Sequence, residues 1–380
     1  MPEGLKIGLV GGIYAKDLAY RAHAEITPET TLERGLRQLG HSVGTYSPFS
    51  RIHEEDFDVV HVHHLGWGAL GASLRRSATP LVFTSHEAPV LQGSWARRAA
   101  LDVVFARSDA VVALSWLERD FLRRSYRLHC EPEVIPNGID PTIYSFVAPE
   151  KRTKHERWRL LYVGQLIELK RVDVLLRSLR LVAADVELCL AYHVNHLESK
   201  LKDLARDFGL GERVHFLGAQ SAAQLARLYQ ESDLLVLPST REALPSVVAE
   251  AMFCGTPVVA TRVGGIPEQL GPYGITVRPD CPEALAGAIA RVLANYSTFV
   301  AQAEEMSQFA RHRASTEIMA AKHVQLYRQC IAAHSRIRQE RNHLFHRAAA
   351  GGVGWICQMK SANWSPITHG RPRPSGDISS

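Results

Sequence analysis

The 380-residue sequence has few cysteines and no long apolar run. Its six cysteines are scattered without CxxC spacing, which argues against a zinc ribbon or a disulfide framework. No apolar stretch reaches about 20 residues, the length that spans a bilayer. The N-terminus MPEGLKIGLVGG also lacks the basic region and long apolar stretch of a signal peptide. We therefore expect a cytoplasmic protein whose only membrane contact is peripheral, at the inner membrane face.

The chain also lacks a strong charge of either sign. Its formal net charge of +5 is small for this length and argues against a nucleic-acid partner. Basic residues nonetheless cluster at 94–107 and 115–129, and the second segment places Trp116, Leu117 and Phe121 at helical spacing. Such a helix either lies on anionic lipid or packs its apolar side into the core, with its basic side in solvent.

The composition, 46% hydrophobic and 22% charged residues, is that of an ordinary globular protein. The length of the chain favours two domains. LKIGLVGG, TLERGLRQLG and the following SVGTY predict a strand, a helix and a second strand. DVVHVHH, PLVFTSH and AVVALS are continuously apolar, as parallel strands buried on both faces are. Residues 1–148 are thus predicted to form a doubly wound α/β domain.

A turn-rich segment, VIPNGIDPTIYSF, and the polar stretch VAPEKRTKHER precede a second cycle. Six strands are predicted from RLLYVGQ, VELCLAY, RVHFLG, DLLVLPS, TPVVAT and GITVRP. Helices are expected between them at 171–183, 196–208, 221–231 and 245–254. This gives a second doubly wound domain over 156–300, followed by C-terminal helices over 301–342 that pack back across the domains. A loose tail is expected over 343–380.

The segment REALPSVVAE carries two carboxylates, Glu242 and Glu250. Glu242 follows a predicted strand, and a helix is expected to start near Pro245. The first N–H groups of that helix, at Ser246 and Val247, and its dipole favour a bound diphosphate.

Glu250 lies one helical turn further in, and helical side chains lean toward the N-terminus. Its two oxygens suit the hydroxyl pair of a ribose. The other interpretation is that both glutamates only complement the helix dipole.

The stretch from Glu242 to Glu268 resembles the signature of glycosyltransferase family 4: a glutamate, seven residues, a second glutamate, then AMFCGTPVVATRVGGIPE. Similar segments follow in family order from residue 5 to 330, among them GLRQLGHSV, DVVHVH, FTSHEAP, IPNGID and YVGQLIELKRVDVLL. The resemblance implies the GT-B fold, in which two facing Rossmann-like doubly wound domains enclose an interdomain cleft. It also implies a retaining transferase that moves a sugar from a nucleotide-sugar donor to an acceptor without a cofactor or metal.

The resemblance assigns roles to individual residues. Glu242 would face the transferred sugar and, with His86 from the first domain, form the catalytic pair. Glu250 would bind the ribose and Lys170 the diphosphate, where a cation neutralises the leaving group.

The resemblance also implies a donor site that includes Leu244, Gln165 and the helix-start residues. Gly11 and Gly12 resemble a glycine loop that lets the backbone approach the donor phosphate or the acceptor.

Three residues depart from the family pattern. Gln165 stands where an arginine is usual, and losing that charge-assisted contact would cost about 1.5 to 3 kcal/mol. Ala243 replaces a glycine and would crowd the sugar pocket. Arg171 also replaces a glycine, and we expect it to supply part of the missing positive charge.

Other functions remain open at this stage. A GT-B nucleotide-sugar epimerase would bind the same donor, and the Gln165 departure permits a binding module without turnover. A glycoside hydrolase also uses two carboxylates, although both would flank one bond. A nicotinamide oxidoreductase is disfavoured because GxGxxG is absent.

A metal site is also disfavoured. His61 and His63 share a strand face without a third ligand. The basic segments suit a sugar or lipid-linked acceptor, as in cell-envelope polysaccharide or glycolipid synthesis.

Overall fold

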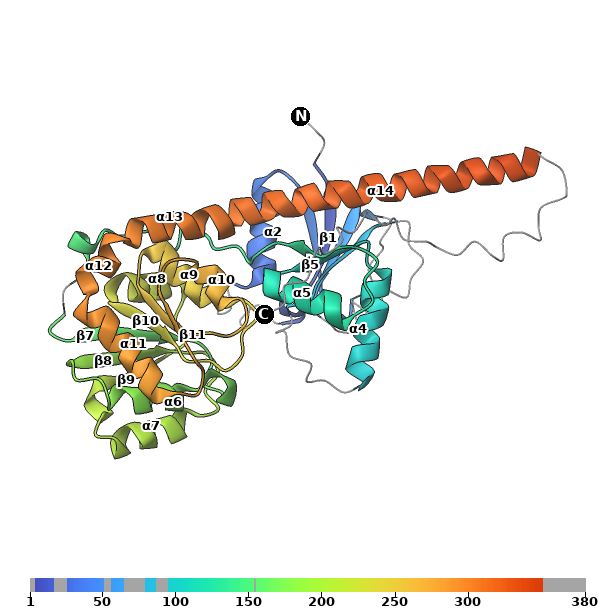
Figure 1. Cartoon of the computed structure of the whole chain (residues 1–380). Coiled ribbons are helices and arrows are strands. Elements are labelled where there is room, and N and C mark those ends of the chain that lie inside the picture. Colours follow the sequence, from blue (N-terminus) through green and yellow to red (C-terminus); the bar gives the residue numbers. More distant parts are fainter. Residues whose placement is uncertain are drawn as a thin grey trace, which may run out of the picture. The chain divides into compact units, whose positions relative to one another are not determined.

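The computed structural model describes residues 4–16, 26–50, 56–64, 79–86, 95–153 and 155–350, with side chains to residue 336. It contains two six-stranded sheets, and every strand pair in them is parallel (Figure 1). Both sheets lie in one compact unit that ends at Ile331.

The first sheet has the order β2-β1-β3-β4-β5-β6. The sequence order reverses beside β1, because β2 lies on one side of it and β3 on the other. In such sheets, ligands bind at the carboxyl ends of the strands where the order reverses. The strands are β1 (Lys6–Val10), β2 (Ser42–Tyr46), β3 (Val59–His63), β4 (Leu81–Thr84), β5 (Ala110–Ala113) and β6 (Glu133–Val134).

The second sheet has the order β12-β11-β10-β7-β8-β9. Its order reverses between β7 and β10, which pair at Leu234 with Leu160. The strands are β7 (Trp158–Val163), β8 (Val186–Ala191), β9 (Val214–Gly218), β10 (Leu234–Leu237), β11 (Val258–Thr261) and β12 (Ile275–Val277). All six strands predicted for this half are confirmed.

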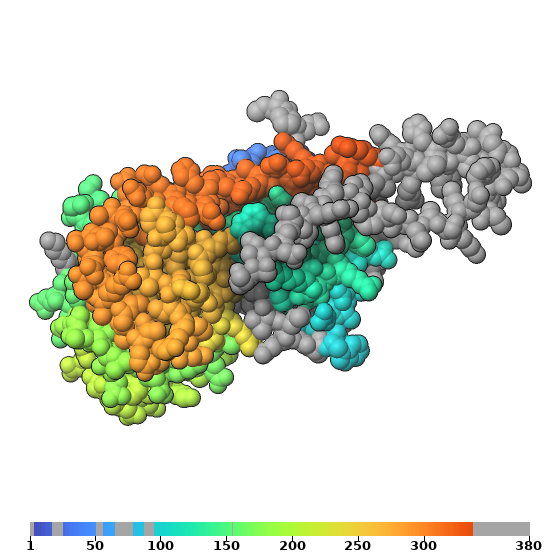
Figure 2. Space-filling model, viewed as in Figure 1, coloured from blue at the N-terminus to red at the C-terminus, as the bar shows by residue number. Residues whose placement is uncertain are grey.

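Helices cover the sheets. They are α2 (Pro28–Gln38), α4 (Trp95–Arg107), α5 (Trp116–Ser125), α6 (Val172–Leu179), α7 (Glu198–Asp207), α8 (Ala222–Glu231), α9 (Ser246–Cys254), α10 (Ile266–Leu270), α11 (Pro282–Ala294), α12 (Tyr296–Ala301), α13 (Ala303–Ala314) and α14 (Thr316–Ala350). Short 3₁₀ turns are η1 (Gly12–Ala15), η3 (Pro149–Lys151), η4 (Glu168–Lys170) and η5 (Gly211–Arg213). On the face in Figure 2, the orange helices α11, α12 and α13 form much of the surface around the second sheet.

The start of α14 belongs to the core of the first domain. Met319, Ala320 and Tyr327 are buried in one cluster with Leu32 and Leu36 of α2. The two helices approach closely at Gly35, where a Cβ would lie 2.8 Å from the Cβ of Ala320. Burying this apolar surface stabilises the first domain with residues from the far end of the sequence.

Three details differ from the sequence predictions. The helix α2 begins at Pro28, ahead of the predicted start, because Thr27 and Thr30 form a capping box. The two-residue strand β6 was not predicted, since it is too short to show a period. The helix α14 continues to Ala350, whereas a loose tail was expected from 343; residues 351–380 lie outside the described part. Among the described residues, no helix is both long and apolar enough to cross a membrane.

Candidate functional site

Two oppositely charged side chains follow the strands at which the order of the second sheet reverses. Lys170 lies in η4 after β7, and Glu242 lies in the loop after β10. The Lys170 Nζ is 2.6 Å from Glu242 Oε1, and the side chains are 20% and 9% exposed. These residues were predicted to belong to one donor site, and the fold brings them into contact at the edge where ligands of such sheets bind.

Backbone contacts hold the two loops together. The N–H and hydroxyl of Thr240 both donate to the Leu169 carbonyl, at 2.9 and 3.1 Å. On the other side, the Gly265 N–H donates to the Ala243 carbonyl at 2.8 Å. Gly264 has φ +53°, and a Cβ there would lie 1.9 Å from the Glu242 carbonyl oxygen. Only glycine fits this approach, so the VGG segment of the family signature shapes the Glu242 loop.

The helix α9 starts directly after this loop. It begins at Ser246 with Pro245 as its N-cap, so the proline lies one residue before the helix and not in its first turn. In the part of the chain that the structure describes, Val248 donates back to the Pro245 carbonyl, whereas the Ser246 and Val247 N–H groups have no acceptor. These two N–H groups and the helix dipole would favour an anion, and the diphosphate role of Ser246 and Val247 stays a prediction.

Glu250 is buried within α9. It is 6% exposed and accepts a 2.8 Å hydrogen bond from the Tyr229 hydroxyl of α8. Burial raises the pKa of the Glu250 carboxyl to about 7, because the charged form loses its hydration. Tyr229 was not singled out from the sequence. The ribose role of Glu250 stays a prediction.

Two residues bear on the missing arginine. Gln165 is half-buried, and its backbone carbonyl accepts a hydrogen bond from the Tyr162 hydroxyl at 2.7 Å. Arg171, expected to replace part of the lost charge, instead pairs with both Asp173 and Asp280. Its guanidinium is therefore already compensated.

The carboxyl edge of the first sheet holds a second group of polar residues beside its order reversal. Gly11 follows β1, and a Cβ there would lie 2.9 Å from Cγ of Glu29, in the first turn of α2. Gly12 is exposed, and no atom of the described residues lies within 4 Å of a Cβ built on it. The buried Glu29 carboxylate lies 3.3 Å from His64 Nε2. Glu29 was not predicted, although its place in the first helical turn after a glycine loop is a sequence signal.

His86 follows β4 and lies among other histidines. Its Nε2 is 2.8 Å from Nδ1 of His63, the last residue of β3. Its ring stacks on His64 with centroids 4.3 Å apart. Both His86 and His64 have positive φ, at 49° and 62°, a strained conformation that is typical of functional sites. Burial, and then the neighbouring His63, hold the pKa of His86 well below its ordinary value, so the ring is neutral.

Within the described ranges, these histidines belong to no group of three His, Cys, Asp or Glu residues that is arranged to hold a metal ion. His61 instead uses both ring nitrogens on hydroxyls, at 2.7 Å from Tyr327 Oη and 2.8 Å from Thr84 Oγ1. His61 therefore joins β3, β4 and α14.

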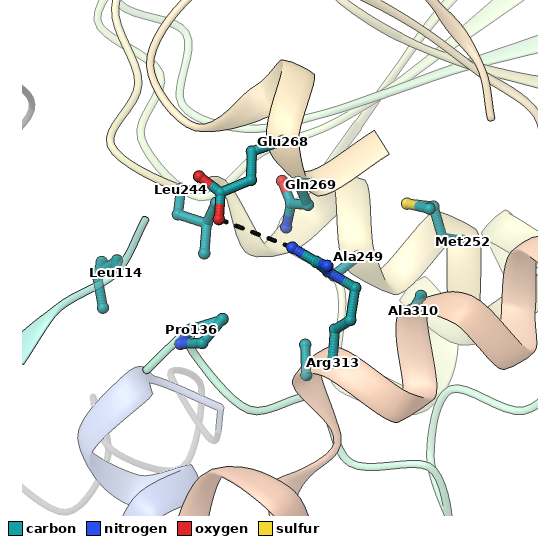
Figure 3. A pocket seen from close by; sticks show the side chains of 10 residues that line it. Leu114, Pro136, Leu244, Ala249, Met252, Glu268, Gln269, Ala310 and Arg313 are labelled. Atoms are coloured by element: carbon teal, nitrogen blue, oxygen red, sulfur yellow. Dashed lines mark ion pairs between the residues drawn. The ribbon is translucent and has the colours of Figure 1, made fainter. Parts of the chain in front are cut away.

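A partly open pocket lies beside the Glu242 loop, and its empty space, open solvent included, is about 370 Å³ (Figure 3). Leu244, predicted to belong to the donor site, lines it with Leu114 and Pro136 of the first domain. Glu268 points into the pocket toward Arg313, at 3.7 Å, and also accepts the Trp116 N–H at 2.8 Å. The end of the family signature therefore contacts the N-terminus of α5.

Two family models match the chain. The one described as Glycosyltransferase Family 4 matches residues 31–143, and the one described as Glycosyl transferases group 1 matches 146–313. The chain belongs to glycosyltransferase family 4. In this member, Lys170, Glu242 and Glu250 lie in the second matched region and His86 in the first, whereas Gly11 and Gly12 precede both.

Curated relatives carry related names. D-inositol 3-phosphate glycosyltransferase 1 of Catenulispora acidiphila is 30% identical over 271 residues, which cover 62% of this chain and 63% of that protein. The match thus spans less than two thirds of that relative. D-inositol 3-phosphate glycosyltransferase of Corynebacterium glutamicum is 26% identical over 328 residues, which cover 78% of each protein.

Solved structures share the architecture. Sucrose-phosphate synthase of Thermosynechococcus elongatus has a TM-score of 0.74 at 22% identity, and the match covers 87% of this chain and 100% of that one. Anabaena HepE in complex with UDP-glucose has a TM-score of 0.69 at 19% identity, with coverage of 87% and 100%. The GT-B fold predicted from the sequence is confirmed.

Proposed function

We propose that this family 4 protein is a retaining glycosyltransferase that transfers a sugar from a nucleotide-sugar donor to a hydroxyl acceptor. The observation that carries the proposal is the Lys170–Glu242 pair, at the reversal of the second sheet and directly before the open N-terminus of α9. The ion pair supplies a cation and a carboxylate, and α9 supplies two N–H groups that have no acceptor among the described residues. A diphosphate needs the cation and the N–H groups, and sugar hydroxyls suit the carboxylate.

In the proposed reaction, the donor diphosphate binds Lys170 and the N–H groups of Ser246 and Val247. Lys170 then exchanges its contact with Glu242 for the phosphate, and Glu242 turns to the sugar. The bond between the anomeric carbon and the phosphate oxygen breaks, and the acceptor oxygen bonds to the same face of that carbon. The acceptor proton passes to the departing phosphate, so the nucleoside diphosphate leaves with a stabilised charge.

The first domain supplies the acceptor side. Gly12 is exposed and Glu29 is a buried carboxylate beside the order reversal, and together they suit an acceptor rich in hydroxyls. His86 would donate a hydrogen bond to a hydroxyl of the transferred sugar. The curated relatives named for D-inositol 3-phosphate support a polyol acceptor, and a uridine donor is supported by the HepE complex with UDP-glucose.

The activity test incubates purified protein with UDP-, GDP- and ADP-sugars and a panel of polyol, sugar and lipid-linked acceptors. We expect a glycosylated product by mass spectrometry whose anomeric NMR signal has the donor's configuration. Glu242→Gln should abolish most of it, whereas Glu212→Gln, an exposed glutamate in η5, should leave it unchanged. Conversion of the donor without acceptor would instead indicate an epimerase, and binding without turnover would indicate the module that Gln165 permits.

A peripheral membrane contact belongs to the same proposal. Trp95, Trp116 and Leu117 are 84%, 51% and 48% exposed at the starts of the basic helices α4 and α5. Exposed tryptophans beside arginines favour an anionic lipid surface. Flotation with liposomes that contain phosphatidylglycerol should recover the protein, and a Trp95→Ser, Trp116→Ser variant should lose this. Equal recovery with neutral liposomes would contradict the contact.

A further inference from the structure

The buried partner of His86 is His63, the last residue of β3. β3 and β4 are neighbouring parallel strands, and His63 pairs with Thr84, the last residue of β4. His86 comes two residues after Thr84 and therefore lies close to His63. The ring nitrogens His63 Nδ1 and His86 Nε2 are 2.8 Å apart, and His63 is only 4% exposed. His63 therefore cannot turn to solvent, and its ring sets where the His86 ring lies.

The contacts of His63 determine which atom holds the proton. A neutral imidazole has one N–H and one bare nitrogen, and one proton lies between two hydrogen-bonded rings. Among the described residues, the other nitrogen of His63, Nε2, is buried without a hydrogen-bond partner. Buried N–H groups without an acceptor are rarer than buried acceptors without a donor. The favoured state of His63 thus leaves Nε2 bare and carries the proton on Nδ1.

This assignment fixes the state of His86 as well. If Nδ1–H of His63 donates, Nε2 of His86 accepts, and the single proton of a neutral His86 must lie on its Nδ1. Both rings are neutral near pH 7, because burial lowers the pKa of His63 to about 3 and holds that of His86 well below its ordinary value. His86 then offers an N–H at Nδ1 to a hydroxyl oxygen.

We propose that His63 is a positioning residue that holds the His86 ring in place and keeps its proton on Nδ1. The inference rests on the proposed function for the use of that N–H, but the proton placement itself does not. His86 is further held by its ring contact with His64, 4.3 Å between centroids, and by its backbone at φ 49°.

His61 provides a matched contrast on the same strand face. Its ring lies 4.3 Å from that of His63 and is fully buried. Both its nitrogens have hydroxyl partners, on Tyr327 and Thr84. Among the described residues, no hydrogen bond links His61 to His86. We therefore infer that His61 contributes to the stability of the fold and not to the position of His86.

Three substitutions of His63 distinguish the effect of its hydrogen bond to His86 from the effect of its side-chain volume. His63→Asn places an amide N–H near the position of Nδ1, so it keeps the bond to His86. His63→Gln places its amide near Nε2, and His63→Leu has no polar atom. If the leucine variant does not fold, the glutamine variant replaces it, because both remove the donor that faces His86.

The first measurement is the ¹⁵N NMR signal of the His86 imidazole, taken without donor or acceptor. Wild type and His63→Asn should show a His86 ring with its proton on Nδ1. In His63→Leu and His63→Gln, the proton should no longer lie on Nδ1 alone. His61→Asn should lower the melting temperature and leave the His86 signal unchanged. The same His86 signal in wild type, His63→Leu and His63→Gln would overturn the proposal.

The second measurement is sugar transfer at saturating donor. We expect kcat to fall about 10- to 100-fold in His63→Leu and His63→Gln, the range for lost orienting contacts, with little change in the donor KM. His63→Asn should restore kcat to within about threefold of wild type. Equal kcat in the asparagine and glutamine variants would overturn the positioning role. If the wild-type protein transfers no sugar, but the His63→Leu and His63→Gln variants still lose the Nδ1 proton signal of His86, the proposed function is wrong and the proton placement is supported.

Discussion

Lys170 and Glu242 are 72 residues apart in the sequence and form a 2.6 Å ion pair where the order of the second sheet reverses. The pair is partly buried, so removing one partner leaves a poorly hydrated charge. In the protein without ligand, Lys170→Gln and Glu242→Gln should each lower the free energy of unfolding, and the double variant should lose less than their sum. We expect a coupling of about 1 to 3 kcal/mol by urea denaturation. Strict additivity would mean that the two side chains do not interact in solution.

The Glu250 carboxyl should make stability depend on pH. Its pKa is raised to about 7 from 4.5, so the folded protein holds this proton more tightly than the unfolded chain does. Its contribution is present below pH 4.5 and is lost as pH rises through 7, by about 3 kcal/mol in total. Glu250→Gln keeps an acceptor for Tyr229 without the charge and should reduce the fall in urea midpoint between pH 5 and pH 8. An unchanged pH profile in this variant would contradict the buried, protonated carboxyl.

Gly264→Ala should displace the Glu242 loop. The added Cβ would lie 1.9 Å from the Glu242 carbonyl, and the backbone there is left-handed at φ +53°. We expect loss of donor binding in a melting assay together with a lower melting temperature. Gly287→Ala is the control, since its Cβ meets nothing within 4 Å inside α11. That change should stabilise the protein by about 0.5 to 1 kcal/mol. Normal donor binding in Gly264→Ala would show that the loop tolerates the shift.

Glu268 should slow hydrogen exchange of the backbone amides at the start of α5. Its carboxylate accepts the Trp116 N–H at 2.8 Å, from a different domain. In Glu268→Ala, we expect faster hydrogen exchange at the amides of Trp116 and Leu117, because the first amides of a helix have no acceptor within it. Glu212→Ala serves as the exposed control. Equal exchange rates in wild type and Glu268→Ala would mean that this contact does not persist in solution.

The sequence predicted most of the fold because parallel strands are continuously apolar and are separated by helices of clear period. It also placed Glu242 after a strand, at the carboxyl edge of the second sheet. These inferences need only local patterns and one topological rule, whereas Lys170 was assigned to the same site by the family resemblance alone.

The sequence could not predict contacts that depend on side-chain packing between distant segments. Tyr229 reaches Glu250 because α8 packs against α9, and the register of β3 with β4 brings His63 to His86. Arg171 looked like a replacement cation, but a turn after β12 brings Asp280 to it. Tyr229 and Asp280 belong to no motif that the sequence analysis found, and the DVVHVH segment contains His63 without indicating its partner.

The most direct test of the account is a thermal melt of purified protein with UDP-, GDP- and ADP-sugars, in wild type and Lys170→Gln. Lys202→Gln is the matched control, because among the described residues the ion pair of Lys202 is with Glu198 on the surface of α7, away from the second sheet's order reversal. A ligand that binds the folded state raises the melting temperature. We predict a rise with one donor class that Lys170→Gln loses and Lys202→Gln keeps. No rise with any donor, or the same rise in both variants, would contradict the donor site assigned to Lys170 and Glu242.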